Sequence, residues 1–168
     1  MGKILPGVYL KHHLLTLHSA LVEYNGRSLA ICAPSGTGKT THVRLWRDCK
    51  NALILNGDRA VIGKTEQGWT AYGTPWSGTS GEQINRHAPL HALVILERSE
   101  ENSVEKLEGL QAFVGMMPHV LYPAWDRELA EIAIDGLNDM LSSIPVYRLC
   151  CRPEKEAVEV LYQALYEG

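Results

Sequence analysis

A short segment rich in glycine and threonine constrains the fold of this 168-residue chain more than any other feature. It follows an apolar stretch, precedes a stretch without glycine or proline, and has the sequence Ala33-Pro34-Ser35-Gly36-Thr37-Gly38-Lys39-Thr40. Gly36 and Gly38 let backbone N–H groups turn inward toward phosphate oxygens, and the start of a helix adds partial positive charge behind them. The segment therefore predicts a phosphate-binding loop (P-loop) between a strand and a helix.

The side chains of this loop have expected roles toward a nucleotide. Lys39 is expected to reach the β- and γ-phosphates of ATP, and the Thr40 hydroxyl to ligate Mg²⁺. The predicted cofactors are therefore ATP and Mg²⁺. Ala33 stands where the strict motif has glycine, at the strand end and away from the phosphates. The alternative is a glycine-rich turn that happens to precede a helix. The predicted nucleotide-binding set is Pro34, Ser35, Gly36, Thr37, Gly38, Lys39, Thr40 and Thr41.

Length and composition predict a single cytoplasmic domain that spans residues 1–168. A net charge of −3 argues against a broad surface for nucleic acid or an anionic membrane. No apolar run approaches the roughly 18 residues of a membrane span, and residues 1–10 do not resemble a signal peptide. The four cysteines form no C-x-x-C pair and are expected to be reduced thiols.

The pattern of apolar residues and turns predicts an α/β fold with a mixed sheet. An Asn25-Gly26 turn joins the first two strands, and the glycine-rich loop and a helix directly follow the second strand. Residues 73–89 lack periodicity and are expected to form a long loop, which is usually functional or mobile. The expected strands are 14–24, 28–33, 52–55, 60–64, 69–72, 90–96 and 145–151, and the expected helices are 39–48, 104–115, 125–143 and 153–166.

Three further segments accompany the loop: His18 upstream, Asn56-Gly57-Asp58-Arg59 downstream, and then Tyr72-Gly73-Thr74-Pro75-Trp76-Ser77-Gly78. Together with the loop they resemble the catalytic domain of HPr kinase/phosphorylase. The nearer resemblance is to small HPr-kinase-like proteins, some of which phosphorylate serine in ribosomal peptide precursors. The resemblance implies a fold related to phosphoenolpyruvate carboxykinase.

The resemblance also implies roles for residues outside the loop. Asp58 matches the general base of the family and is expected to help hold Mg²⁺, whereas Gly57 replaces a first aspartate. That replacement predicts kinase activity without efficient phosphate removal. His18 matches a catalytic-site histidine, and is expected to orient Asp58 or the serine hydroxyl. The alternatives are that Asp58 is a turn residue beside Asn56-Gly57 and that His18 is a satisfied core histidine.

The expected function is therefore ATP-dependent transfer of the γ-phosphoryl group to a serine hydroxyl. The expected partner is a peptide or small protein, and the catalytic residues are Asp58, His18 and Lys39. Two alternatives stay open: a kinase for a small metabolite, and a nucleotide-binding regulatory or peptide-binding module without transfer activity. Residues 74–81 are expected to form a lid or a peptide-docking loop, with a plain surface loop as the alternative.

Overall fold

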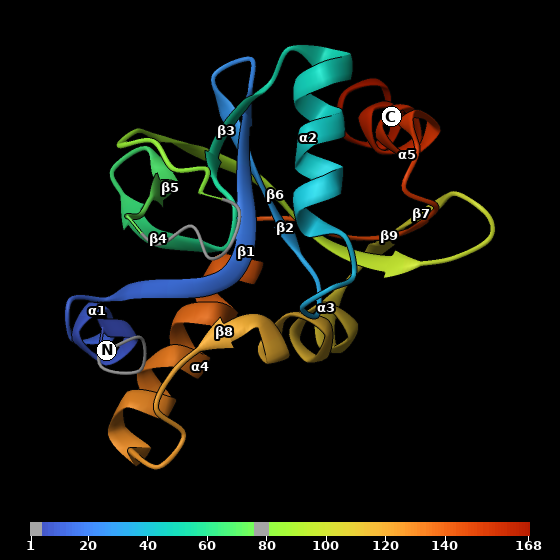
Figure 1. Cartoon of the computed structure of the whole chain (residues 1–168). Coiled ribbons are helices and arrows are strands. Elements are labelled where there is room, and N and C mark those ends of the chain that lie inside the picture. The colour runs from blue at the N-terminus through green and yellow to red at the C-terminus, as the bar shows by residue number, and fades with distance from the viewer. Residues whose placement is uncertain (1–4, 76–80) are drawn as a thin grey trace.

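Residues 5–75 and 81–168 are described by a computed structural model (Figure 1). Nine strands in these ranges form a mixed sheet with the order β2-β1-β4-β5-β6-β9-β7, in which β3 and β8 pair with β1 and β2 also pairs parallel with β6. This confirms the expected α/β class. The strands are β1 Leu14–Tyr24, β2 Arg27–Cys32, β3 Leu53–Asn56, β4 Arg59–Thr65, β5 Gly68–Gly73, β6 His87–Arg98, β7 Ser103–Leu107, β8 Val120–Leu121 and β9 Val146–Cys151.

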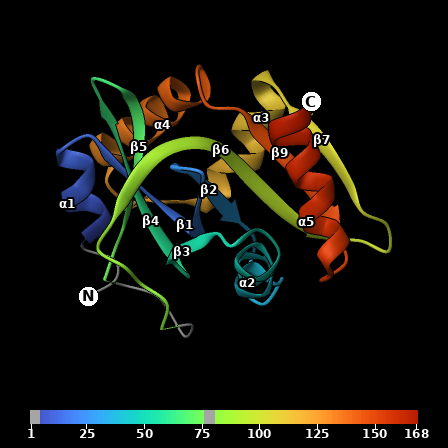
Figure 2. The same ribbon diagram turned by 90° about the horizontal axis from the view of Figure 1, so that it is seen from above.

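Helices cover both faces of the sheet, with α2 and α4 on opposite sides in two perpendicular views (Figures 1 and 2). Side chains of α2 and α5 belong to one buried cluster, and those of α1, α3 and α4 belong to another. The arrangement is therefore a helix–sheet–helix sandwich. The helices are α1 Leu5–Lys11, α2 Lys39–Lys50, α3 Gly109–Met116, α4 Arg127–Leu141 and α5 Lys155–Tyr162, with a 3-10 turn η1 at Met117–His119 and a π-helical end η2 at Gln163–Glu167.

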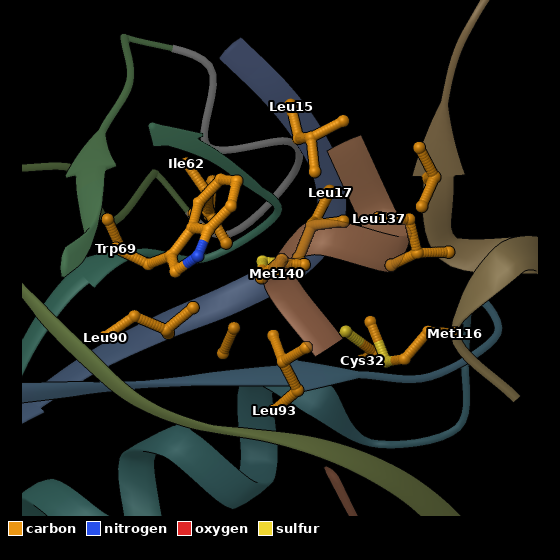
Figure 3. Packing of buried hydrophobic residues seen from close by; sticks show 14 of the residues in the cluster. Leu15, Leu17, Cys32, Ile62, Trp69, Leu90, Leu93, Met116, Leu137 and Met140 are labelled. Atoms are coloured by element: carbon orange, nitrogen blue, oxygen red, sulfur yellow. The ribbon is translucent and has the colours of Figure 1, made fainter. Parts of the chain in front are cut away.

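The larger cluster lies between the sheet and α4. Leu137 and Met140 of α4 are fully buried against strand side chains such as Leu17 and Leu93 (Figure 3). Burying a leucine or methionine side chain contributes roughly 1.5–3 kcal/mol. This cluster fixes the sheet on which the candidate site is built.

The hairpin of β1 and β2 leads the chain into the glycine-rich loop. Asn25 and Gly26 both have positive φ, 49° and 78°, which is the backbone of a two-residue turn that matches the twist of paired strands. The register runs from Tyr24 opposite Arg27 to Ser19 opposite Cys32. The end of β2 therefore lies beside the middle of β1.

Strand β1 changes its pairing partners at His18. Residues 14–18 pair with β4, and residues 16–17 also pair with β8, which must lie on the other edge. From Ser19 onward the strand pairs with β2, and residues 21–23 pair with β3. Because a two-residue turn joins β3 to β4, these two strands share one edge of β1, and β2 and β8 share the other. His18 lies where the four partners meet.

The predicted helix at 104–115 is wrong in its first part. Ser103–Leu107 is the strand β7, which pairs antiparallel with β9, and the helix begins only at Gly109. Pairing with a distant strand decided the structure of a short segment that local propensity left undetermined. The helix α1 and the short strand β8 were not predicted, and β6 begins three residues earlier than expected.

Within residues 5–75 and 81–168, no helix is long and apolar enough to cross a membrane. All four cysteines are free, and Cys32 and Cys151 are buried. Burial raises the pKa of Cys32 to about 12 and that of Cys151 to about 11. These two thiols therefore stay protonated at neutral pH and act as small core residues.

Candidate active site

The glycine-rich loop lies between the end of β2 and the start of α2. Gly36 and Gly38 have positive φ of 79° and 110°, and Gly38 is the N-cap of α2. A Cβ added at either glycine would meet no atom within 4 Å, so the space above the loop is open. Glycine is needed here for the left-handed backbone, and the open side leaves room for an anion at the helix start.

Arg98, at the end of β6, anchors the outer side of this loop. Its guanidinium donates to the carbonyl oxygen of Gly36 at 2.6 Å and lies 3.5 Å from that of Thr37. The Thr37 N–H in turn donates to the Pro34 carbonyl at 3.1 Å. These contacts direct two carbonyl groups of the loop toward the arginine.

A cavity of about 360 Å³ adjoins the loop. It lies where the carboxyl ends of β6 and β9 meet the first turn of α2. In open α/β sheets, ligands bind in the crevice outside the carboxyl ends of the strands. The cavity therefore lies where the nucleoside part of a nucleotide could be placed if its phosphates lay on the loop. Its lining residues are Thr37, Gly38, Thr41, His42, Leu96, Glu97, Arg98, Cys151 and Pro153.

The three predicted catalytic residues meet at one point. The Nε2 atom of His18 lies 2.8 Å from Nζ of Lys39 and 3.0 Å from Oδ1 of Asp58. The three residues come from β1, from the start of α2 and from the turn between β3 and β4. His18 and Asp58 are each about one quarter exposed, with side-chain accessibilities of 26%. The cluster is therefore open to a ligand on one side.

Burial and charge act in opposite directions on Lys39. The side chain is buried, and desolvation lowers the pKa of its ammonium group, while the charge of Asp58 raises it. A buried ammonium is costly unless an anion compensates it. A bound phosphate would supply that compensation, so the donor set fits a nucleotide.

Asn56 holds the turn that carries Asp58. Its fully buried side chain accepts from the N–H groups of Asp58 and Arg59 at 2.8 and 2.7 Å. The Nδ2 atom donates to the carbonyl oxygen and the hydroxyl of Thr74 at 2.7 and 3.1 Å. One side chain thus connects the Asp58 turn to the start of the loop over residues 74–81.

The predicted Mg²⁺ ligands are two oxygen donors. The Thr40 hydroxyl, in the first turn of α2, and the Asp58 carboxylate are of the type that Mg²⁺ prefers, and this ion usually keeps several waters. Among the described residues, no group of three or more His, Cys, Asp or Glu side chains is arranged to hold a metal. The two oxygen donors therefore fit Mg²⁺ in kind.

Comparison with known families and structures identifies the group to which this chain belongs. The model of the family described as "SynChlorMet cassette protein ScmC" matches residues 1–163. The chain belongs to the ScmC family. No significant match was found among curated protein sequences.

The fold of this ScmC-family chain is similar to that of an enzyme of known structure. The Hpr(Ser) kinase/phosphatase from Coxiella burnetii superposes with a TM-score of 0.52 over 90% of this chain and 88% of that chain. The two sequences are 9% identical. The likeness at this identity concerns the fold, and it confirms the expected HPr-kinase-like architecture.

Two charged residues in the segment 73–89 have structural partners. Arg86 forms a two-pronged ion pair with the buried Glu23, at 2.7 and 2.8 Å. Glu82 lies 3.3 Å from Arg44 and 3.4 Å from Arg47, both on α2. Its carbonyl oxygen accepts from Gly57, next to Asp58, at 3.0 Å. The end of the long loop therefore returns to the candidate site, while its residues 76–80, including Trp76, lie outside the described residues.

The sequence interpretation missed two residues at this site of the ScmC-family chain. Arg98 was not singled out, although an arginine two residues after the buried run at 90–96 would have been a signal. His119, in the turn η1, was also missed because its position depends on the short strand β8. Thr40 is half-buried and Thr41 exposed at the start of α2, and Pro34 and Ser35 are exposed on the loop.

Proposed function

We propose that this ScmC-family protein is an ATP-dependent kinase that transfers the γ-phosphoryl group to a serine hydroxyl of a peptide or small protein. The observation that supports this most is the meeting of Lys39, from the glycine-rich loop, with Asp58 at His18. A phosphate-binding cation and a carboxylate within one hydrogen-bonded cluster are what phosphoryl transfer requires. The likeness in fold to an Hpr(Ser) kinase/phosphatase supports the same proposal.

The nucleotide is proposed to lie along the loop. The phosphates face the open side of Gly36 and Gly38, where loop N–H groups and the start of α2 favour negative charge. The nucleoside occupies the cavity of about 360 Å³ between the loop and the ends of β6 and β9. Thr40 and Asp58 would hold Mg²⁺, whose chemistry is to neutralise charge on the phosphates.

The protein residues divide the remaining work. Lys39 and the loop N–H groups stabilise negative charge on the transferring group. Asp58 accepts the proton of the acceptor hydroxyl as that oxygen attacks. His18 contacts Asp58 through Nε2 and holds its carboxylate in place, and Asn56 fixes the turn beneath it. Arg98 keeps the loop shaped for phosphate before any ligand arrives.

Gly57 is the reason to expect that the proposed kinase does not remove phosphate efficiently from its product. It occupies the position of the first aspartate in the family that the sequence resembles, so a second carboxylate is missing beside Asp58. We therefore expect transfer to the acceptor without efficient removal of phosphate from it. Incubation of phosphorylated product with inorganic phosphate tests this, because rapid release of pyrophosphate would contradict it.

A nucleotide-binding module without transfer activity is the second candidate function, and Gly57 is the observation that favours it. A direct test separates the two. Purified protein, Mg²⁺ and γ-labelled ATP are incubated with small serine-containing polypeptides encoded beside the gene, since the family is described as a cassette protein. Label on the wild-type acceptor, and none after replacement of its serine by alanine, supports the kinase. Tight binding of ATP with no transfer to any such acceptor would favour the module.

A further inference from the structure

His119 lies next to the cluster of His18, Lys39 and Asp58. Strand β8 pairs antiparallel with β1, with Thr16 opposite Leu121 and Leu17 opposite Val120. His119 is the last residue of the 3-10 turn η1 and directly precedes β8, and His18 directly follows the two residues of β1 that pair with β8. The chain therefore brings His119 to the part of β1 that carries His18.

The electrostatic environment of His119 agrees with this position. Burial is the main cause that lowers the pKa of its imidazole, and the charges of His18 and Lys39 lower it further. His119 is therefore neutral at pH 7 and offers one N–H donor and one acceptor nitrogen.

The ring of His119 has no hydrogen-bonding partner within residues 5–75 and 81–168. The residue is only 8% exposed, and among the described residues nothing forms a hydrogen bond with its side chain. Its ring nitrogens are not among the fully enclosed polar atoms without a partner, so a ligand can reach them. A ligand at the site would supply the missing partner.

The location of His119 indicates which part of a ligand its ring would contact. The turn that carries Asp58 lies on the edge of β1 shared by β3 and β4. His119 lies on the other edge of β1, with which β2 also pairs. On that edge, Ala33 continues from β2 into the glycine-rich loop. The acceptor hydroxyl is assigned to the Asp58 side, so His119 lies on the phosphate side, near Lys39.

We propose that His119 donates a hydrogen bond from its ring N–H to the γ-phosphoryl group of the bound nucleoside triphosphate. The inference rests on the proposed function, because it requires a triphosphate on the loop. Lys39 supplies charge at this place, whereas the neutral imidazole supplies direction. His119 thus distinguishes a triphosphate from a diphosphate, which lacks the group that it contacts.

The test compares the affinities of two nucleotides by calorimetry with Mg²⁺: a non-hydrolysable ATP analogue and ADP. His119→Ala should weaken binding of the analogue about tenfold, the usual effect of a hydrogen bond to a charged group, and change ADP affinity less than twofold. His119→Gln, which keeps an N–H donor, should recover part of the loss. Met117→Ala alters the same turn without touching the imidazole, and should leave the ratio of the two affinities unchanged.

The possible outcomes separate the inference from the proposed function. Equal losses for both nucleotides, or no loss for either, would overturn the role of His119 while leaving nucleotide binding in place. Wild-type protein that binds neither nucleotide would overturn the proposed function, and the inference with it. If His119→Ala does not fold, the inference is tested instead by NMR on wild-type protein with ¹⁵N-labelled histidine. The ring nitrogens of His119, assigned from the His119→Gln spectrum, should shift with the analogue and not with ADP, and no shift with the analogue would overturn the inference.

Discussion

The Nζ atom of Lys39 lies 2.8 Å from Nε2 of His18, so the ammonium group and the imidazole are in hydrogen-bonding contact. The same nitrogen lies 3.0 Å from the carboxylate of Asp58. A ring nitrogen carries either a proton or a lone pair, and it cannot donate to Asp58 and accept from Lys39 at once. Movement of Lys39 to a phosphate therefore leaves His18 free to donate to Asp58. In the proposed kinase, binding of the nucleotide would be coupled in this way to the orientation of Asp58.

Lys39→Met should abolish tight binding of ATP without harming the fold. The change removes the ammonium that stabilises the phosphates, and affinity for a non-hydrolysable ATP analogue should fall at least tenfold. Burial lowers the pKa of the Lys39 ammonium, so its loss should not destabilise the protein without nucleotide. Calorimetry and urea unfolding measure the two effects. Lys50→Met, on the same helix, should leave the affinity unchanged.

Asp58→Asn should separate binding from chemistry. Asparagine keeps the shape but takes no proton, so transfer should fall by roughly 10²–10⁴-fold while ATP affinity changes modestly. A loss that high Mg²⁺ largely restores would identify Asp58 as mainly a metal ligand. Asp48→Asn, at an exposed ion pair, is the matched control. Transfer at the wild-type rate by Asp58→Asn would show that Asp58 is only a turn residue.

Asn56→Ala should be among the most damaging polar substitutions. It leaves the N–H groups of Asp58 and Arg59 without their acceptor, and removes both bonds to Thr74. Each buried group left unsatisfied costs about 1–3 kcal/mol, so the free energy of unfolding should fall by about 2–4 kcal/mol. Denaturant unfolding measures this free energy. Asn85→Ala, at an exposed position, should cost less than about 0.5 kcal/mol.

His42 should make the protein less stable in mild acid. Burial lowers the pKa of its imidazole to about 4, while an unfolded histidine has its ordinary value of 6.5. As the pH falls from 6.5 to 4, the unfolded chain takes up a proton that the folded chain refuses, so stability is full above pH 6.5 and declines below it. The total loss is on the order of 3 kcal/mol. His42→Gln, which keeps an acceptor for Trp46, should show a smaller decline in unfolding free energy over this range when both are measured with EDTA.

Much of the fold was predictable because its signals are local. The Asn25-Gly26 turn, the buried run at 90–96 and the glycine-rich loop each specify structure within a few residues. The segment 103–107 gave no such signal, because its strand exists through pairing with β9. The single-domain organisation and the cytoplasmic location stay predictions, as does phosphate binding by the loop.

The candidate site was predictable only in part, for a related reason. Lys39 belongs to a local motif, and Asp58 and His18 came from a resemblance whose residues the fold brings within hydrogen-bonding distance. Arg98 and His119 belong to no local motif. Their positions follow from the end of β6 and from a two-residue strand, and such positions exist only once the sheet has formed.

The exchange of partners along β1 has a consequence for how the protein acquires activity. His18 is 21 residues from Lys39 and 40 from Asp58, and β8, which carries His119 beside it, is about a hundred residues further along. Neither half of the sheet alone contains the whole cluster, because each edge of β1 supplies only some of its groups. A chain that is still emerging from the ribosome, or one cleaved between the two edges, therefore lacks the complete cluster. His18, Lys39 and Asp58 come together only once strands on both edges of β1 have paired.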